Sequence, residues 1–183
     1  MKPYFLVLHN YLKLTFYKIF VCKEISFKKV QLLSRQTRLR LSADARVELG
    51  NHIITDGHST LVVNDGAKLI IGGTVYLNEG CMISCKEKIE IGQGCQFGPG
   101  VMIFDNNHKY DALNGVQSRH STREIKIGKN CWLAANVVVL KGTVIEDNCV
   151  IGAGCIISGH IPKGSVVTGS RELTIQKIEK KEK

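Results

Sequence analysis

One histidine is better placed for acid–base chemistry than any other residue in the chain. It lies in residues 104–124, a polar stretch that contains the segment DNNHKYD (105–111) and is flanked by aliphatic repeats. A neutral imidazole near pH 7 can take a proton from a hydroxyl or an amine, so His108 is the candidate general base. His120, deeper in the same stretch, is the fallback. The other four histidines are expected to lie on the surface: His9, His52, His58 and His160.

The elements that must position this histidine follow a strict period of six. From residue 127 to 161, an aliphatic residue recurs every six positions at Ile127, Leu133, Val139, Ile145, Ile151 and Ile157. A small or β-branched residue follows four later each time, at Cys131, Val137, Thr143, Cys149, Cys155 and Ile161. Residues two apart share one face of a strand, and the Gly, Asn and Asp residues between them suit turns. Each hexad is therefore one short strand and a corner, and stacked coils bury a continuous core.

This repeat resembles the hexapeptide-repeat acyltransferase family, whose fold is a left-handed parallel β-helix of triangular coils. The resemblance covers roughly residues 60–170, and it supplies the handedness. We therefore expect an all-β parallel β-helix at residues 41–170, with a loop extruded at 104–124. A basic, apolar helical segment is expected at 1–40, and a charged tail with a short helix at 171–183. A change of repeat register at 86–88 predicts a bulge at a corner.

The resemblance also implies catalytic residues. In this family a histidine at the base of such a loop is the general base, which favours His108. The motif Asn-Asn-His-x-Tyr-Asp, followed by Gln117, looks most like the members that O-acetylate sugars and surface polysaccharides. The oxyanion donor implied is the backbone amide of Ala135, within the segment WLAA (132–135), where an Ala replaces the usual Gly.

For acetyl-CoA, the resemblance implies a site along the coil wall and at its last corner. The residues implied are Trp132, Ala135, Ala153, Lys163 and Arg171. Ala135 and Ala153 also fit as plain turn residues, and Trp132 as an ordinary packed aromatic. The family's usual Pro after Gly169 is missing, which weakens this assignment. Two residues are implied for acceptor binding: Asn78 and Asp105.

The function expected from the resemblance is transfer of an acetyl group from acetyl-CoA to a sugar hydroxyl, in surface polysaccharide biosynthesis, by a cytoplasmic homotrimer without a metal. Transfer to a small soluble acceptor, such as a free sugar, an amino acid or a xenobiotic, is the first alternative. A non-catalytic structural β-helix is the second. The basic chain ends lack the aromatic interleaving of a nucleic-acid-binding surface, so no nucleic acid partner is expected.

Net charge and cysteine content indicate where the basic character lies and which redox compartment the protein suits. The net charge of +9 arises at the ends, because residues 51–170 carry ten basic and ten acidic side chains. Five of the seven cysteines fall at inward repeat positions, where a free thiol packs as a small hydrophobe: Cys81, Cys95, Cys131, Cys149 and Cys155. The odd number of cysteines favours a reducing compartment.

The N-terminal segment has two interpretations. Apolar residues recur at helical spacing, interrupted by lysines that leave no run long enough to span a bilayer: Phe5, Leu8, Leu12, Phe16 and Ile19. No cleavage site follows an apolar core, so a signal peptide is not expected. The helix either packs on the β-helix or a neighbouring subunit, or residues 1–30 rest on an anionic membrane at its inner face.

Overall fold

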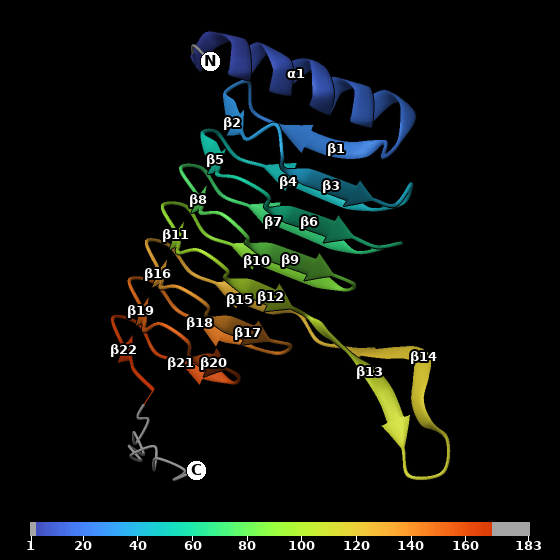
Figure 1. Ribbon diagram of the computed structural model, residues 1–183, viewed down its shortest axis with the longest axis vertical. Coiled ribbons are helices and arrows are strands. Elements are labelled where there is room, and N and C mark those ends of the chain that lie inside the picture. The colour runs from blue at the N-terminus through green and yellow to red at the C-terminus, as the bar shows by residue number, and fades with distance from the viewer. Residues whose placement is uncertain (1–2, 170–183) are drawn as a thin grey trace, which may run out of the picture.

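The computed structural model describes residues 3–169, and it is a parallel β-helix with one helix across its first coil (Figure 1). The all-β solenoid predicted from the repeat is confirmed. Three parallel sheets form its sides, and each full coil contributes one strand to each sheet. The first sheet contains β1 (Glu24–Phe27), β4 (Arg46–Leu49), β7 (Lys68–Ile71), β10 (Lys88–Ile91), β15 (Ile125–Ile127), β18 (Val144–Ile145) and β21 (His160–Ile161). The second contains β2 (Gln31–Leu33), β5 (Ile53–Thr55), β8 (Tyr76–Leu77), β11 (Gln96–Phe97), β16 (Trp132–Leu133), β19 (Val150–Ile151) and β22 (Val166–Val167). The third contains β3 (Arg38–Leu41), β6 (Thr60–Val63), β9 (Met82–Cys85), β12 (Met102–Phe104), β17 (Val138–Leu140) and β20 (Ile156–Ile157).

The inward positions read from the repeat form the core. Every aliphatic residue of the period from Ile127 to Ile157 is buried, and so are the small residues four later up to Cys155. Ile161 is the exception and is half-buried, because few coils lie beyond it. All seven cysteines are buried free thiols, as predicted for the five at repeat positions. Burial raises the pKa of Cys81 to about 11, so this thiol stays protonated near neutral pH.

Asparagine and glycine make the corners because the backbone there takes positive φ. Asn130, Asn136 and Asn148 have φ values of 54°, 57° and 61°. Asn tolerates this left-handed conformation better than other residues with a Cβ. The period-six pattern therefore encodes both the buried face of each strand and the turn that follows it.

The coils near the N-terminus are longer than the hexad period predicts. Val47 pairs with Leu69, 22 residues on, whereas Lys126 pairs with Val144, 18 residues on. The early coils carry four-residue strands in two of their three sheets, which absorb the extra length. The coils become shorter at the corner between β9 and β10, which contains only residues 86 and 87, and this shorter corner produces the predicted change of register at 86–88.

The helix α1 (Pro3–Phe20) closes the first coil, and strands begin much earlier than predicted. β1 starts at Glu24, so the expected boundary at residue 41 is wrong: residues 24–41 are the first coil. Its buried residues keep the period of six, as at Ile25, Gln31 and Thr37, but the polar side chains of Gln31 and Thr37 hid this coil from a search for aliphatic hexads. Asn10 Nδ2 donates to the carbonyls of Gln31 and Leu33, at 3.2 and 2.9 Å. The predicted packing of this helix on the β-helix is confirmed.

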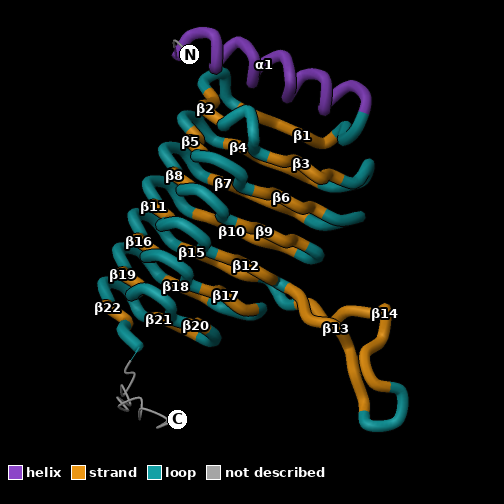
Figure 2. Tube along the Cα trace, in the orientation of Figure 1, coloured by secondary structure: helices purple, strands orange, loops and turns teal. Residues whose placement is uncertain are grey.

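The polar stretch between the repeats leaves the coil as predicted, but as an ordered antiparallel hairpin (Figure 2). Its strands are β13 (Asn106–Asp111) and β14 (Gly115–Thr122), which project away from the solenoid between β12 and β15. Asn114 and Gly115 lie where the chain reverses, and Gly115 has a φ of 63°. The predicted C-terminal helix falls in residues 171–183, outside the described part of the chain.

Candidate functional site

Asp105 anchors the hairpin at its root. Its carboxylate is fully buried and accepts hydrogen bonds from the backbone amides of Lys86, at 2.8 and 3.0 Å, and Glu87, at 2.8 Å. Asn106 Nδ2 donates to the same carboxylate at 3.0 Å. The Asp105 carbonyl accepts from the amide of Arg123 at 2.9 Å, so both ends of the hairpin are tied to one residue. The expectation that Asp105 binds acceptor is corrected, because every polar group of its side chain is engaged away from solvent.

The hairpin presents His108 in a defined tautomer. Its Nδ1 lies 3.1 Å from the backbone carbonyl oxygen of Gln117, across the hairpin. A carbonyl only accepts, so Nδ1 carries the proton and Nε2 keeps its lone pair. The side chain is exposed, and the same carbonyl would stabilise the imidazolium formed when Nε2 takes a proton. The geometry is that of a general base with its second nitrogen held in place.

His120 lies directly opposite His108 on the partner strand. The two rings are 4.2 Å apart between centroids and inclined by 42°. The pKa of His120 is lowered by burial first, and then by the positive charge of Lys86 and by His108. His120 is therefore neutral near pH 7, and it packs on the ring of His108 without adding a competing charge.

A second polar network holds the tip of the hairpin. The Asp111 carboxylate accepts from the amides of Leu113 and Asn114, at 2.9 and 2.7 Å. It also accepts from the side-chain amide of Gln117. Hydrogen bonds from the Asn114 backbone amide, then from its side chain, lower the pKa of Asp111. This network fixes the strand position of Gln117, whose carbonyl orients His108.

The second half of the expected site is the corner after β16. Within the described residues 3–169, the backbone N–H of Ala135 donates to no acceptor. The corner of the preceding coil approaches it closely, because a Cβ added to Gly98 would lie 2.8 Å from the Ala135 nitrogen. Ala153 is exposed at the equivalent corner of the next coil. Trp132, which is 53% exposed, stands on the sheet surface between Gln96 and Val150.

One chain does not bring these two halves together. The hairpin leaves the corner that joins the third sheet to the first, whereas Ala135 lies at the corner that joins the second sheet to the third. In Figure 1 the hairpin projects from one side of the solenoid and β16 lies on the opposite side. His108 and Ala135 therefore lie on different sides of one subunit, as a site shared between neighbouring subunits would require.

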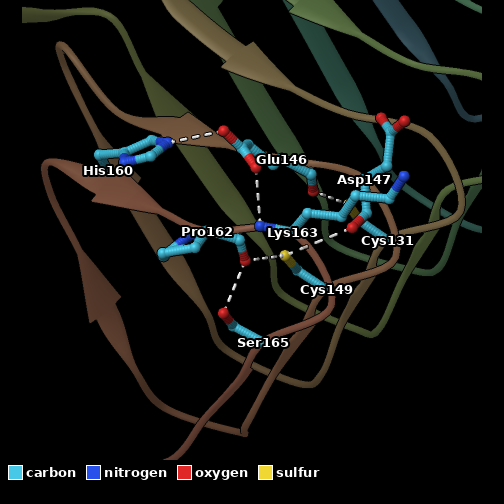
Figure 3. Close-up of polar contacts among 8 residues, drawn as sticks. All are labelled: Cys131, Glu146, Asp147, Cys149, His160, Pro162, Lys163 and Ser165. Atoms are coloured by element: carbon cyan, nitrogen blue, oxygen red, sulfur yellow. Dashed lines mark hydrogen bonds and ion pairs between the residues drawn. The ribbon is translucent and has the colours of Figure 1, made fainter.

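Lys163 lies at a third place, the corner that joins the first sheet to the second (Figure 3). Its backbone amide donates to the Glu146 carboxylate at 2.8 Å, and His160 Nε2 lies 3.0 Å from the other oxygen. Both contacts lower the pKa of Glu146, and the hydrogen bond from the Lys163 amide has the larger effect. Glu146 and Asp147 line this corner together with Lys126 and Lys163, so its carboxylates and ammonium groups are equal in number. Lys163 and Ala135 thus lie at different corners of the coil.

The remaining expected residues have mixed outcomes. Asn78 is half-buried at the corner after β8, and its Oδ1 accepts from the amide of Glu79 at 2.7 Å. Arg171 lies outside the described residues. Among residues 3–169, no group of three or more His, Cys, Asp or Glu side chains is arranged to hold a metal ion.

Sequence reasoning missed the residues that position His108. Lys86 and Glu87 act through backbone amides, which carry no signal in residue type. The Asn114-Gly115 pair was a usable signal, since Asn-Gly between two extended segments is typical of a hairpin turn. It would have predicted a hairpin there but not its register, because the turn found is residues 112–114 and Asp111 pairs with Gly115.

Known proteins match this chain over its repeat region. Residues 124–159 match the family described as bacterial transferase hexapeptide (six repeats). A galactoside O-acetyltransferase from Lactococcus lactis is 32% identical over 63% of this chain and 56% of its own length. A putative lipopolysaccharide biosynthesis O-acetyl transferase from Escherichia coli is 29% identical over 60% of each chain. The chain thus spans less than two thirds of these relatives.

A solved structure matches more of the fold. It is a mutant of AntD, an N-acyltransferase from Bacillus cereus in complex with dTDP and coenzyme A, with a TM-score of 0.67 and 15% identity. The match covers 83% of this chain and 82% of that one. Repeat and fold together make this chain a parallel β-helix in which residues 124–159 match the bacterial transferase hexapeptide family.

Proposed function

We propose that this protein transfers an acetyl group from acetyl-CoA to a hydroxyl of a sugar. The observation that carries the proposal is the hydrogen bond from His108 Nδ1–H to the Gln117 carbonyl, which leaves Nε2 free as a base on a hairpin extruded from a hexapeptide coil. The sugar O-acetyltransferases among the relatives support this reaction class. The coenzyme A bound in the AntD structure supports the acyl donor.

The proposed reaction needs a base and an oxyanion donor. Nε2 of His108 takes the proton of the acceptor hydroxyl while its oxygen attacks the thioester carbonyl carbon. The oxyanion that forms accepts a hydrogen bond from the free N–H of Ala135. The carbon–sulfur bond then breaks, and the CoA sulfur leaves with the proton from the imidazolium. Acetylated sugar and CoA are the products, and no further reactant is needed.

We further propose that the active form is a homotrimer, in which the hairpin of one subunit meets the coil wall of the next. The support is that His108 and Ala135 occupy opposite sides of one solenoid, so the site is incomplete in one chain. Exposed apolar side chains on the second and third sheets suit subunit contacts: Trp132, Ile156 and Val166. Trp132 and Ala153 are proposed to line the acetyl-CoA site of this interface, with Asn78 toward the acceptor.

We propose an acceptor in surface polysaccharide or its lipid-linked precursor, with the reaction in the cytoplasm at the inner face of the membrane. The lipopolysaccharide O-acetyl transferase among the relatives supports this acceptor class. A free sugar is the alternative acceptor, favoured by the galactoside O-acetyltransferase. The two acceptors would use the same catalytic residues.

The direct test separates binding from catalysis. Acetyl-CoA binding is measured by titration calorimetry, and CoA release is measured with a panel of free sugars and polysaccharide precursors. His108→Ala should lower turnover by about 10²–10⁴-fold with acetyl-CoA affinity nearly unchanged. His58→Ala, which removes an exposed histidine near Glu79, is the matched control and should leave turnover intact. Undiminished turnover by His108→Ala would remove His108 as the base.

The shared site is tested by mixing two inactive variants. His108→Ala lacks the base, and Ala135→Pro lacks the N–H donor. If each site uses one residue from each of two neighbours, randomly mixed trimers should recover about a quarter of the wild-type activity. No recovery, with both variants folded and trimeric, would contradict a site shared between subunits.

A further inference from the structure

The helix α1 closes the first coil using only one of its faces. Besides the bonds from Asn10, Lys13 Nζ donates to the Thr37 carbonyl at 3.0 Å, and Tyr17 Oη donates to the Leu39 carbonyl at 3.1 Å. Leu14 is fully buried between these residues. These side chains satisfy carbonyl groups that would otherwise form an unpaired sheet edge. The structural role of α1 is therefore complete on this inner face.

The opposite face of α1 is apolar and uncovered. Seven large apolar side chains are between 55% and 83% exposed there: Tyr4, Phe5, Leu8, Leu12, Phe16, Ile19 and Phe20. A helix that only caps a coil would carry polar residues toward water, and a helix that is apolar all round is normally buried. The outer face of α1 is thus built to be covered. Among the described residues, no helix is long and apolar enough to cross a bilayer.

The charge around this face selects the partner. Residues 3–42 contain eight Lys or Arg and a single acid, Glu24, which pairs with Arg46 at 2.9 Å. Seven of the basic residues are exposed, and none forms an ion pair within the described chain; they form a basic rim around the helix: Lys18, Lys23, Lys28, Lys29, Arg35, Arg38 and Arg40. A second copy docked end to end would bring two such basic rims together, which is unfavourable. An anionic surface satisfies the rim and the apolar face at once.

The arrangement is that of an interfacial helix. α1 lies across the end of the solenoid, so its outer face points away from the coils (Figure 2). Beside it, an open groove of about 620 Å³ runs between the helix and the first coils. Tyr4, Leu8 and Tyr11 line the groove on one side, and Lys29, Leu32 and His52 on the other. An apolar groove with a lysine at its edge fits an acyl chain below an anionic headgroup.

We propose that the outer face of α1 and the surrounding basic rim dock this protein on a membrane containing anionic lipids. This inference rests on the proposed location of the reaction at the membrane, and it specifies anionic lipids as the ligand and the outer face of α1 as the contact surface. The helix would lie in the headgroup region with Leu8, Leu12 and Phe16 inserted. Docking needs neither acetyl-CoA nor the hairpin, so it is measured without turnover.

The test is co-sedimentation of the full-length protein with vesicles. Vesicles of phosphatidylcholine are compared with vesicles that contain about a third phosphatidylglycerol, and binding should be at least about tenfold stronger to the anionic ones. Raising the salt concentration should weaken it, because the charges are exposed. Absence of binding to anionic vesicles, or equal binding to both kinds, would overturn the proposal.

Variants then test the named residues. Leu8→Gln with Leu12→Gln should lower the vesicle partition coefficient at least about tenfold. The matched control replaces two exposed apolar residues elsewhere, Leu113→Gln with Val116→Gln, and should change it less than about twofold. Equal losses for both pairs would contradict the assigned surface. Circular dichroism and thermal unfolding check that each variant is folded. We expect both to be folded, because Gln is a good helix former.

The basic rim has its own pair of variants. Lys28→Gln with Lys29→Gln should lower the partition coefficient about fivefold for each charge removed. The control, Lys126→Gln with Lys129→Gln, removes two exposed lysines far from α1 and should have little effect. If the wild type ignores vesicles while the Leu8 and Leu12 variant has a smaller assembly in solution, the face is covered by another copy and the membrane proposal fails. Vesicle binding without any acetyl transfer would leave the docking surface standing and reject the proposed enzyme alone.

Discussion

Replacing Asp105 by Asn should detach the hairpin that carries His108 from the coil. The carboxylate accepts from two backbone amides and one side-chain amide while fully buried. Asn has a similar shape but keeps a single acceptor oxygen, so its amide group would face at least one buried N–H donor. Losing a charge-assisted hydrogen bond and leaving a buried donor unpaired should cost about 2–4 kcal/mol.

Two measurements report this loss. For a urea dependence of about 2 kcal/mol/M, the unfolding midpoint should fall by about 1–2 M. Hydrogen exchange should report a local effect, with the cross-strand amides of residues 106–122 exchanging at least about 30-fold faster. Turnover should fall while acetyl-CoA affinity is retained, because Asp105 positions the hairpin and does not contact the proposed donor site.

A matched variant makes the prediction refutable. Asp65→Asn makes the same chemical change at an exposed turn between β6 and β7, which is the equivalent corner of an earlier coil. It should change stability by less than about 0.5 kcal/mol. If Asp105→Asn shifts the midpoint no more than Asp65→Asn does, or if the hairpin amides keep their protection, the anchoring role of Asp105 is wrong.

Three further predictions follow from the site and the core. Lys86→Gln should raise the pKa of His120 in an NMR titration, because it removes a positive charge that lowers it. The folded pKa of His120 lies below its ordinary value of 6.5, so the hairpin should lose stability as pH falls through 6.5. Lys86→Gln should reduce this loss, and an unchanged His120 titration in that variant would contradict the prediction. Gly98→Ala and Gly72→Ala meet backbone atoms at 2.8 and 2.6 Å and should each cost about 1–3 kcal/mol of stability. Only Gly98→Ala should also lower turnover, since it displaces the Ala135 amide; equal turnover in both variants would argue against that donor. Finally, the seven buried thiols should not react with Ellman's reagent in the folded protein and should all react in urea, whereas fast reaction of a native thiol would contradict its burial.

The solenoid could be predicted from sequence because its core is encoded locally. Each hexad specifies its own strand and corner, and stacking needs contacts only with neighbouring coils. The coil at residues 24–41 escaped prediction because two of its inward residues, Gln31 and Thr37, are polar. The next coils keep alternate residues buried in four-residue strands, as in Val47 and Leu49, and are longer than three hexads.

The candidate site was less predictable because its contacts are not local. His108 was found from residue type and context, but its orientation depends on the Gln117 carbonyl, which any residue could supply. Asp105 was expected to bind the acceptor on the resemblance alone. Its burial follows instead from two backbone amides a coil away, at residues 86 and 87.

The separation of Lys163 from the other expected acetyl-CoA residues follows from counting along the coil. Ala135 and Ala153 are 18 residues apart, one coil in this part of the chain, so they stack at one corner. Lys163 comes ten residues after Ala153, which carries the chain through the third sheet and past the first, to the next corner. A phosphate bound near the stacked alanines would need cations from elsewhere, and one subunit's Lys163 is held beside the Glu146 and Asp147 carboxylates. In the proposed homotrimer, the neighbouring subunit would supply that charge at the same interface that would bring His108 to Ala135.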